Sequence, residues 1–585
     1  RLHLKKKEKE ETGKIIERRK NIVIGILERS KDFAFVIPTG SFGKDIYIPN
    51  SQIKNAANKD LVAVEITFWG DNSRKPEGKV IKILGSSTNS KNMIEALIFR
   101  ENLSESFSSE AMQQTNAIIA NSKIDYTNRK DLTNLSIITI DGADAKDLDD
   151  AVYVEKLENG NYKLIVAIAD VSYYVKKDTV LDLEARNRGN SVYLVDRVLP
   201  MFPKEISNGI CSLNEKEEKL TFSCEMEIDL KGKVVNYEVY KSVIKSVHRM
   251  TYKAVNGILD GDKDLINEYS DIYEMLKQML ELSKILREKK HKRGSIDFEL
   301  PELKVVLDKD EKVEKVYLKD RGEGEKIIED FMIAANETVA ERIFWLELAS
   351  IYRTHEKPDR EKIVKLNEIL SKFGYKIPNF DNIHPKQFQE IIERSRNKET
   401  SMLVHKTILT SLKQARYTVE DIGHFGLASS HYTHFTSPIR RYADLMVHRV
   451  LFSTIDNSVK PFKEADLDEI AQHISKTERV AMKAEDESVR IKLVEYMQKR
   501  VGEKLTIMVA GFAPRKVFFE TDEHIECSWD VTTSPNYYVF DEENYCMVDR
   551  ESDTVFNLGD KVEAVLERAD LLTLEISVKP LKDIF

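Results

Sequence analysis

Short apolar runs with period-two alternation lie near both ends of the chain. Near the N-terminus the runs IVIGIL, FAFVIP, DIYIP and LVAVEITFWG are separated by Gly, Pro, Asn and Asp within residues 21–86. Near the C-terminus the runs LTIMVAGF, KVFFE and KVEAVLE repeat this spacing within residues 501–585. Short alternating runs bounded by turn residues are typical of β-strands. Each region therefore predicts a small β-barrel of the OB type.

The pattern between the two barrels mixes strand and helix periodicity. Residues 87–130 have helical spacing and predict a connector. The apolar run LSIITI precedes an acidic loop and two strands joined at Asn159-Gly160, a dipeptide typical of hairpins. Residues 326–347 predict a helix packed on the resulting sheet. We expect a large mixed α/β domain over 131–455, completed by a charged helical segment over 456–500.

Composition agrees with a multidomain α+β protein. The chain has 585 residues, 41% hydrophobic and 32% charged, which is enough to bury several cores. Residues 1–20 are rich in Lys, Arg and Glu and predict a solvated arm or a short charged helix. No run of about 18 apolar residues and no signal-peptide pattern is present, so we expect a cytoplasmic protein without a membrane partner. A net charge of −9 leaves room for a local basic surface that binds nucleic acid.

Five aspartates crowd into the ten residues DGADAKDLDD at 141–150. Four of them can converge on one point, because one follows a strand and three are almost adjacent: Asp141, Asp147, Asp149 and Asp150. Like charges at this density repel one another unless cations lie between them, and oxygen ligands suit Mg²⁺ or Mn²⁺. The EF-hand order of ligands does not fit this loop. A solvated acidic turn remains the alternative interpretation.

A second polar stretch, HYTHFTSPIRRYADLMVHR at 431–449, places two arginines after a proline. Pro438 should end any local helix and set a turn. The guanidinium groups of Arg440 and Arg441 suit a phosphate, although a salt bridge to Asp444 is the alternative. Three histidines lack the spacing of a zinc site and are predicted to be structural or to donate hydrogen bonds to residues of the site: His431, His434 and His448.

Aromatic residues recur on the predicted strands of both barrels. Phe33, Phe35 and Tyr47 would share one face and form a stacking platform for bases. The alternative is that they fill the core of their own barrel. In the C-terminal barrel three phenylalanines repeat the pattern: Phe512, Phe518 and Phe519.

Several long motifs carry a resemblance to a known family. The runs TIDGADAKDLDDAVY, SNGICSLN, RGSIDFELPE, IIEDFMIAANE and YTHFTSPIRRYADLMVHR occur in order along the chain. Together they resemble the catalytic domain of the ribonuclease II family, and within it the bacterial ribonuclease R branch. The resemblance implies a cold-shock-like barrel, an RNB catalytic domain and a C-terminal S1 barrel.

The resemblance also implies roles for individual residues. Asp141, Asp147, Asp149 and Asp150 match the metal-binding and catalytic aspartates, whereas Asp144 is left as scaffold. Tyr193 matches the tyrosine that packs at the 3′-terminal nucleotide, and Phe298 matches the aromatic residue at the far end of the stacked nucleotides. Arg440 matches an arginine that contacts phosphate. Glu485 is the expected acid of the following helix, with Glu478 as its rival.

The expected activity is processive 3′→5′ hydrolysis of single-stranded RNA with a free 3′ end. Membership of this family implies release of nucleoside 5′-monophosphates, Mg²⁺ or Mn²⁺ as cofactor, and a monomer without an obligate protein partner. Two alternatives stay open on the sequence: a catalytically silent RNA-binding protein with an RNB domain, and a metal-dependent nuclease acting on DNA.

Overall fold

The computed structural model describes residues 2–7, 10–15, 21–39, 43–71, 73–298, 300, 302–319, 321–456, 461–552 and 554–581. Its N-terminal segment is an antiparallel hairpin of β1 (Leu2–Lys7) and β2 (Glu10–Ile15). The predicted short helix is therefore wrong for residues 2–7 and 10–15, whereas the solvated arm stays a prediction. In the register of this hairpin, Lys6 lies opposite Glu11 and Lys7 lies opposite Glu10.

The first barrel closes in the order β3-β4-β5-β7-β6. Its strands are β3 (Ile22–Arg29), β4 (Phe33–Pro38), β5 (Ile46–Pro49), β6 (Asp60–Phe68) and β7 (Glu77–Ser86). Alternate residues of β4 and β5 point inward, so Ala34, Val36, Ile46 and Ile48 are fully buried. Intervening residues of the same strands consequently face outward.

Two helices connect this barrel to the central domain, α1 (Ser90–Arg100) and α2 (Ser109–Ala120). Side chains of Asn89 and Ser108 cap their N-termini by accepting backbone N–H bonds. The buried face of α1 contacts β3 and β6 of the barrel and the long helix α13 (Glu464–Gln498). The connector is therefore a packed element between two domains.

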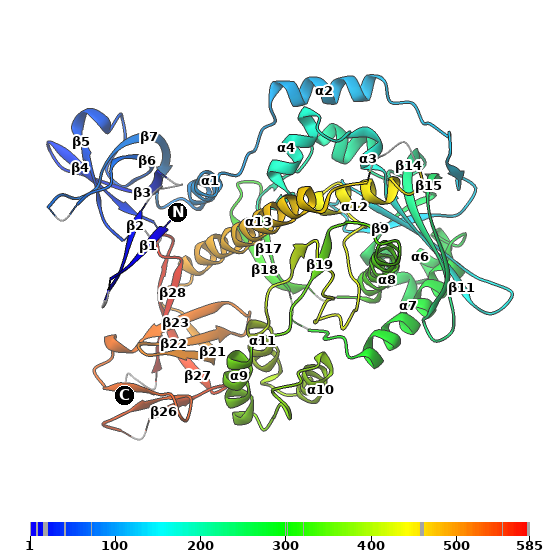
Figure 1. Ribbon diagram of the computed structural model, residues 1–585. Helices are drawn as coiled ribbons and strands as arrows, with labels where there is room; N and C mark the ends of the chain where they lie inside the picture. Colours follow the sequence, from blue (N-terminus) through cyan, green and yellow to red (C-terminus); the bar gives the residue numbers. More distant parts are fainter. Residues whose placement is uncertain are drawn as a thin grey trace.

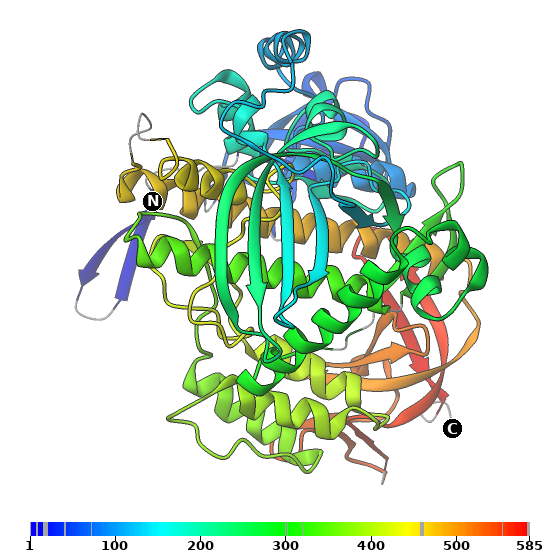
Figure 2. The same ribbon diagram turned by 90° about the vertical axis from the view of Figure 1, so that its right-hand side faces the viewer.

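A seven-stranded mixed sheet forms the centre of the molecule (Figure 2), in the order β16-β9-β10-β11-β14-β15-β8. The strands are β8 (Lys130–Asp131), β9 (Ile138–Asp141), β10 (Asp150–Lys156), β11 (Tyr162–Ala169), β14 (Glu218–Ile228), β15 (Val234–Lys245) and β16 (His248–Thr251). Gly160 has φ +86°, as the tight turn between β10 and β11 requires. The predicted hairpin is thus confirmed.

Helices cover both faces of this sheet. Successive side chains of its strands point to opposite faces, and both sets are buried. Val152, Val154 and Val166 face the helices α7 (Tyr273–Arg293) and α8 (Glu323–Trp345). Ala151 and Ala167 face the opposite core, which α4 (Val180–Arg188) and α12 (Tyr442–Phe452) complete. The helix predicted over 326–347 is α8, and it packs on the sheet as predicted.

Smaller elements surround this core. The short helices are α3 (Val171–Tyr174), α5 (Tyr252–Leu259) and α6 (Lys263–Glu268), and a π-helical turn spans Glu205–Ile210. The small sheets pair β12 (Val192–Tyr193) with β13 (Val198–Leu199), β17 (Glu302–Leu307) with β18 (Val313–Lys319), and β19 (Tyr352–Thr354) with β20 (Arg416–Thr418). A helical group consists of α9 (Arg360–Lys372), α10 (Pro385–Ser395) and α11 (Ser401–Ser411).

A second closed barrel follows α13, in the order β21-β22-β23-β28-β27. Its strands are β21 (Lys504–Ala513), β22 (Lys516–Thr521), β23 (Glu526–Asp530), β27 (Lys561–Asp570) and β28 (Glu575–Pro580), and a separate sheet contains β24 (Tyr538–Asp541), β25 (Cys546–Asp549) and β26 (Val555–Asn557). The two barrels and the central domain confirm the multidomain α+β class predicted from the sequence.

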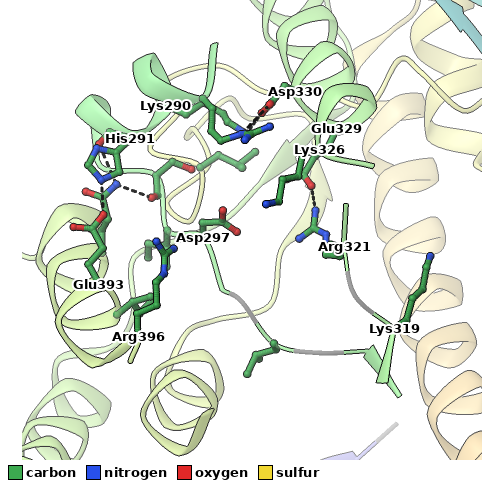
Figure 3. Close-up of a pocket in the computed structure, with 17 residues that line it drawn as sticks. Lys290, His291, Asp297, Lys319, Arg321, Lys326, Glu329, Asp330, Glu393 and Arg396 are labelled. Atoms are coloured by element: carbon green, nitrogen blue, oxygen red, sulfur yellow. Dashed lines mark hydrogen bonds and ion pairs between the residues drawn. The ribbon is translucent and has the colours of Figure 1, made fainter. Parts of the chain in front are cut away.

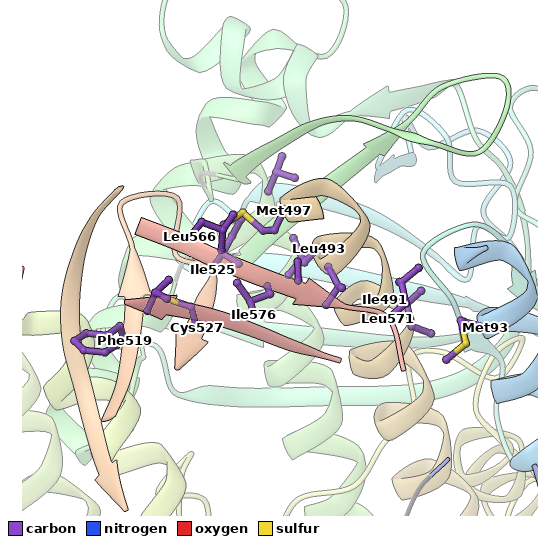
Figure 4. Packing of buried hydrophobic residues seen from close by; sticks show 14 of the residues in the cluster. Met93, Ile491, Leu493, Met497, Phe519, Ile525, Cys527, Leu566, Leu571 and Ile576 are labelled. Carbon is purple, nitrogen blue, oxygen red and sulfur yellow. The ribbon is translucent and has the colours of Figure 1, made fainter. Parts of the chain in front are cut away.

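One apolar core joins the second barrel to α13 and to α1 (Figure 4). It includes Met93 of α1, Met497 of α13 and Ile576 of β28. Figure 1 shows α13 running from beside the barrels into the central domain, where it contacts α4 and α12. Because buried side chains of α13 pack against both the second barrel and α1, this helix connects the two in one core.

The expected aromatic face of the second barrel does not form. Phe519 is fully buried and Phe512 is almost so, whereas Phe518 is 42% exposed. Phe512 stacks on Phe540 at 5.8 Å between ring centroids, and Phe519 contacts Phe556. A register shift in β21 between Val509 and Gly511 changes which residues point inward.

Within the described residues, no helix has the length and apolar character needed to cross a bilayer.

Candidate active site

The aspartate loop, residues 141–150, connects two neighbouring strands of the central sheet. Asp141 ends β9 and Asp150 begins β10. The backbone carbonyl of Asp149 accepts a hydrogen bond from Ala169 of β11 at 2.9 Å. Both ends of the loop are therefore fixed by the sheet, and Asp144 lies exposed in its middle.

Three carboxylates of this loop have an unsatisfied buried oxygen. The Oδ2 atoms of Asp141, Asp149 and Asp150 are buried and have no hydrogen-bond partner within the described part of the chain. The other oxygen of Asp149 accepts the backbone N–H of Ile439 at 2.8 Å, which fixes the orientation of this carboxylate. Ionised carboxylate oxygens that are buried without hydrogen bonds are costly, so this arrangement suits a positively charged ligand.

The pKa values of these carboxylates are raised, because burial and the neighbouring negative charges disfavour their ionised forms. Burial, with the charges of Asp150 and Asp147 added, raises the pKa of Asp141 to about 8. Burial raises the pKa of Asp150 to about 6 and that of Asp149 well above its ordinary value, although Arg440 opposes both shifts. Neighbouring carboxylates of this kind are stabilised in the ionised form by cations.

The donor set fits hard divalent cations, which bind oxygen ligands. Among the side chains that the structure describes, no group of three or more His, Cys, Asp or Glu forms a ready coordination sphere. The oxygens that lack hydrogen bonds and the raised pKa values fit carboxylates that bind divalent cations.

Tyr193 lies beside Asp147, the remaining predicted aspartate of the loop. Its hydroxyl donates to Oδ2 of Asp147 at 3.2 Å, and its backbone N–H donates to Oε1 of Glu485 on α13 at 2.9 Å. The side chain is accessible, since 38% of the residue is exposed. The predicted residues Tyr193 and Glu485 are therefore brought together, and Glu485 holds the tyrosine backbone. The rival acid Glu478 pairs with Arg353 at 2.6 Å instead.

The turn at Pro438 places Arg440 against the aspartate loop. Helix α12 begins only at Tyr442, so the turn predicted from the proline is confirmed. Nε of Arg440 lies 3.7 Å from Oδ2 of Asp149, and its side chain is 42% exposed. Because this guanidinium is accessible and adjacent to the carboxylates, it can contact a bound phosphate.

The second arginine of the pair has different contacts. Both Nε and Nη2 of Arg441 donate to Asp444, at 2.9 and 2.7 Å, and Asp444 also accepts the backbone N–H of Ser437. The described side-chain hydrogen bonds of Arg441 therefore go to Asp444 at the start of α12, as the salt-bridge alternative predicted. The backbone of this turn also pairs with residues 189–191, which lead into Tyr193.

The three histidines of this motif have structural partners. His434 shares a hydrogen bond with the hydroxyl of Tyr417 at 2.9 Å, and His448 bonds to the carbonyl of Phe435 at 2.8 Å. His431 pairs with Asp421 at 2.5 Å. Burial lowers the pKa of both His434 and His448, so these two rings are neutral.

Phe298 lies apart from the aspartate loop, half-buried against the core of α9 to α11. The residues that flank it, Asp297 and Leu300, line a cavity of about 530 Å³ (Figure 3). Basic side chains gather around this cavity: Arg287, Lys290, Lys319, Arg321, Lys326 and Arg396. Several are paired, as Lys290 is with Asp330 at 2.5 Å. The lining nevertheless has more cations than carboxylates, which suits a phosphate backbone.

The aromatic residues of the first barrel form a cluster on its outer face. Ring centroids of Phe33, Phe35 and Tyr47 are separated by 5.5 to 5.9 Å. Lys75 lies over the ring of Phe35 at 4.6 Å. All three rings are half-buried and lie outside the barrel core, which excludes the core-filling alternative.

Some residues that shape the site were not predicted from the sequence. Tyr252, the first residue of α5, is mostly buried, and the charges of Asp141 and Asp150 contribute to its raised pKa. Ser212 and Arg249 bond to the backbone of the aspartate loop. The sequence could not predict these contacts, because the partners of both side chains are main-chain atoms far away in sequence. The one available signal is that Ser212 lies within the motif SNGICSLN.

Comparison with known families gives two matches. A model of the RNB domain matches residues 129–457, and a model of the cold shock domain matches residues 35–108. The first match contains the aspartate loop, Tyr193, Phe298 and Arg440.

Individual proteins are similar over most of the chain. A protein named ribonuclease R from Thermotoga maritima is 42% identical over 576 residues, which cover 96% of this chain and 81% of the relative. Ribonuclease R from Escherichia coli is 33% identical, with 94% and 69% covered. A solved structure, Mycoplasma genitalium RNase R in complex with ribose methylated single-stranded RNA, superposes with a TM-score of 0.90 at 26% identity, covering 99% of this chain and 94% of that one.

Proposed function

We propose that this protein is a processive 3′→5′ hydrolytic exoribonuclease, because the chain belongs to the RNB family and to its ribonuclease R branch. The sequence motifs predicted this membership. The expected products are nucleoside 5′-monophosphates. The observation that carries this proposal is the set of three buried carboxylate oxygens without a hydrogen bond in the described residues, beside the accessible guanidinium of Arg440. An acidic site with one adjacent arginine suits hydrolysis of a phosphodiester.

Divalent metal ions complete this site. We propose that Mg²⁺, with Mn²⁺ as a substitute, is held by Asp141, Asp147, Asp149 and Asp150. The ions, when bound, supply positive charge at the scissile phosphate and activate water for hydrolysis. Asp149 is oriented for this role by the N–H of Ile439, and the guanidinium of Arg440 steadies the phosphate.

Stacking side chains account for degradation without sequence preference. The ring of Tyr193 packs at the 3′-terminal nucleotide, and Phe298 contacts the other end of the stacked bases. Base stacking on aromatic rings contributes about 1–3 kcal/mol per base, and any base can make it. The lining cations near Phe298 would contact the RNA backbone.

The two barrels extend the RNA-binding surface. The outward cluster of Phe33, Phe35 and Tyr47 is a stacking platform on the cold-shock-type barrel. We propose that the C-terminal barrel is of the S1 type and also binds RNA. The substrate is single-stranded RNA with a free 3′ end, and the protein acts in RNA turnover and processing as a cytoplasmic monomer.

Digestion of end-labelled RNA tests the proposed function. Single-stranded RNA labelled at either end should yield mononucleotides in Mg²⁺, whereas single-stranded DNA should not. A duplex with a 3′ overhang measures the degradation of structured RNA. We expect Asp149→Asn to lower the rate by about 10³-fold or more, because the site loses a charged ligand whose orientation is fixed.

Asp144→Asn is the matched control, because Asp144 lies in the same loop and is exposed. It should retain the wild-type rate. Binding of RNA without release of mononucleotides would favour the silent RNA-binding alternative, and equal hydrolysis of DNA would favour a general nuclease. An unchanged rate in Asp149→Asn would contradict the proposed site.

A further inference from the structure

The middle of the aspartate loop has no regular secondary structure, although its ends lie on β9 and β10. Four carboxylates that repel one another must be held by this irregular backbone. Backbone N–H and C=O groups in such a loop need partners outside it. Two side chains from other parts of the catalytic domain provide these partners.

Ser212 bonds to the second half of the loop. Its hydroxyl donates to the carbonyl of Lys146 at 2.9 Å and accepts the N–H of Leu148 at 3.1 Å. The backbone N–H of Leu213 donates to the carbonyl of Leu148 at 3.0 Å. Ser212 is fully buried and Leu148 is 1% exposed, so these bonds are shielded from water. They fix the backbone on both sides of Asp147 and next to Asp149.

Arg249 bonds to the first half of the loop. It lies on β16, which runs parallel to β9, so that Arg249 is opposite Thr139 in register. Its Nη2 donates to the carbonyls of Ala143 and Ala145 at 3.2 and 2.5 Å. One guanidinium therefore binds two carbonyls of the loop, and Arg249 is exposed at the surface.

We propose that Ser212 and Arg249 are positioning residues that hold the aspartate loop in the geometry required for divalent metal binding. This inference rests on the proposed function, because it concerns the metal site of the same reaction. Both side chains act through main-chain carbonyl and amide groups of the loop. Partners that orient the ligands of a metal site commonly contribute about 10- to 100-fold to metal affinity.

Two variants of Arg249 separate the effect of its charge from the effect of its hydrogen bonds. A cation near a metal site repels the ion, but the charge of Arg249 also favours the ionised form of Asp141, so loss of the charge alone has two opposed effects. Loss of the two hydrogen bonds would instead loosen the loop and weaken metal binding. Arg249→Met removes both the charge and the donors but keeps the aliphatic stem, and Arg249→Lys keeps the charge and one point of contact.

The test measures Mn²⁺ binding by electron paramagnetic resonance without RNA, and the Mg²⁺ concentration that gives half-maximal hydrolysis. The variants are Ser212→Ala, Arg249→Met and Arg249→Lys. Ser246→Ala is the matched control for the serine, since Ser246 is 1% exposed and its hydroxyl donates to the carbonyl of His248. Arg360→Met is the control for the arginine, since Arg360 pairs with Asp381 on an exposed surface.

We expect Ser212→Ala and Arg249→Met each to weaken Mn²⁺ binding by about tenfold or more and to raise the Mg²⁺ requirement equally. Arg249→Lys should fall between Arg249→Met and the wild type. Binding of RNA in EDTA and both control variants should keep wild-type values. Hydrolysis at saturating Mg²⁺ should recover to near the wild-type rate.

Mn²⁺ binding by Arg249→Met that equals or exceeds wild type overturns the inference, as does unchanged binding by Ser212→Ala. Should the buried Ser212→Ala variant fail to fold by circular dichroism, the exposed Arg249 variants decide the question alone. A wild-type protein that binds Mn²⁺ but releases no mononucleotides contradicts the proposed function, while the Mn²⁺ measurements still test the positioning residues.

Discussion

At the scale of single residues, Tyr193 is held by two bonds with separable roles. Its backbone is fixed by Glu485 and its hydroxyl by Asp147, while the ring stays accessible. If the ring packs at the 3′-terminal nucleotide, Tyr193→Ala should lengthen the limit product, because the last stacked bases lose their partner. Gel analysis of the final products of 5′-labelled RNA measures this length.

Tyr193→Phe is the matched variant, because it keeps the ring and removes only the hydroxyl that donates to Asp147. It should give a limit product of wild-type length. The same product ladder in Tyr193→Ala and the wild type would refute a role of the ring in setting the cleavage position.

Residue spacing predicted part of the site because its ligands are close in sequence. The four aspartates lie within ten residues, and the arginines follow a proline whose effect on backbone is local. The stacking role of Tyr193 came from the family motif. Its contact with Glu485 could not be predicted, because the two residues are separated by 292 positions and meet only in the packed fold.

At the scale of elements, α12 buries an uncharged histidine. Burial lowers the pKa of His448 to about 4, and its ring lies 4.6 Å from that of Phe435. Below the unfolded pKa of 6.5 the unfolded chain binds a proton that the folded chain does not, so acid favours unfolding. The stabilisation is full above pH 6.5 and declines as the pH falls toward 4.

We expect the wild type to lose about 2 kcal/mol more stability between pH 7 and pH 5 than His448→Gln does. Glutamine keeps an N–H donor for the carbonyl of Phe435 but does not titrate. Urea unfolding at several pH values gives the two slopes. Parallel pH profiles would show that His448 is protonated in the folded protein.

Elements with a strong local pattern were predicted from the sequence, and those governed by tertiary context were not. The hairpin at Gly160 and helix α8 follow from turn chemistry and helical spacing. The hairpin of β1 and β2 was missed because an alternative, helical interpretation suits the same charged residues. Phe512 turned inward because β21 contains a register shift that alternation alone cannot reveal, whereas Phe519 on β22 follows the ordinary alternation of its strand.

At the scale of the whole molecule, one buried lysine joins three parts of the chain. Nζ of Lys492 on α13 donates to the hydroxyl of Ser90 on α1 at 2.8 Å and to the carbonyl of Glu311, between β17 and β18, at 2.5 Å. It also pairs with Glu495 at 2.9 Å. Lys492→Met should cost about 3 kcal/mol, because it leaves these buried groups without a cation.

Hydrogen exchange should then become faster in α1 and in the turn near Glu311, with β10 and β11 unaffected. Lys483→Met is the control, because Lys483 is an exposed residue of the same helix. Equal protection of α1 in both variants would mean that Lys492 does not couple the first barrel to α13.

The bond between Asp149 and Ile439 spans 290 positions. A ribosome that adds about 5–20 residues per second needs roughly 15–60 s to make the intervening chain. During that time the nascent chain has the acidic loop but lacks both the amide that orients Asp149 and the guanidinium of Arg440. A growing chain, or one released before residue 439, therefore lacks the contacts that assemble the proposed catalytic site.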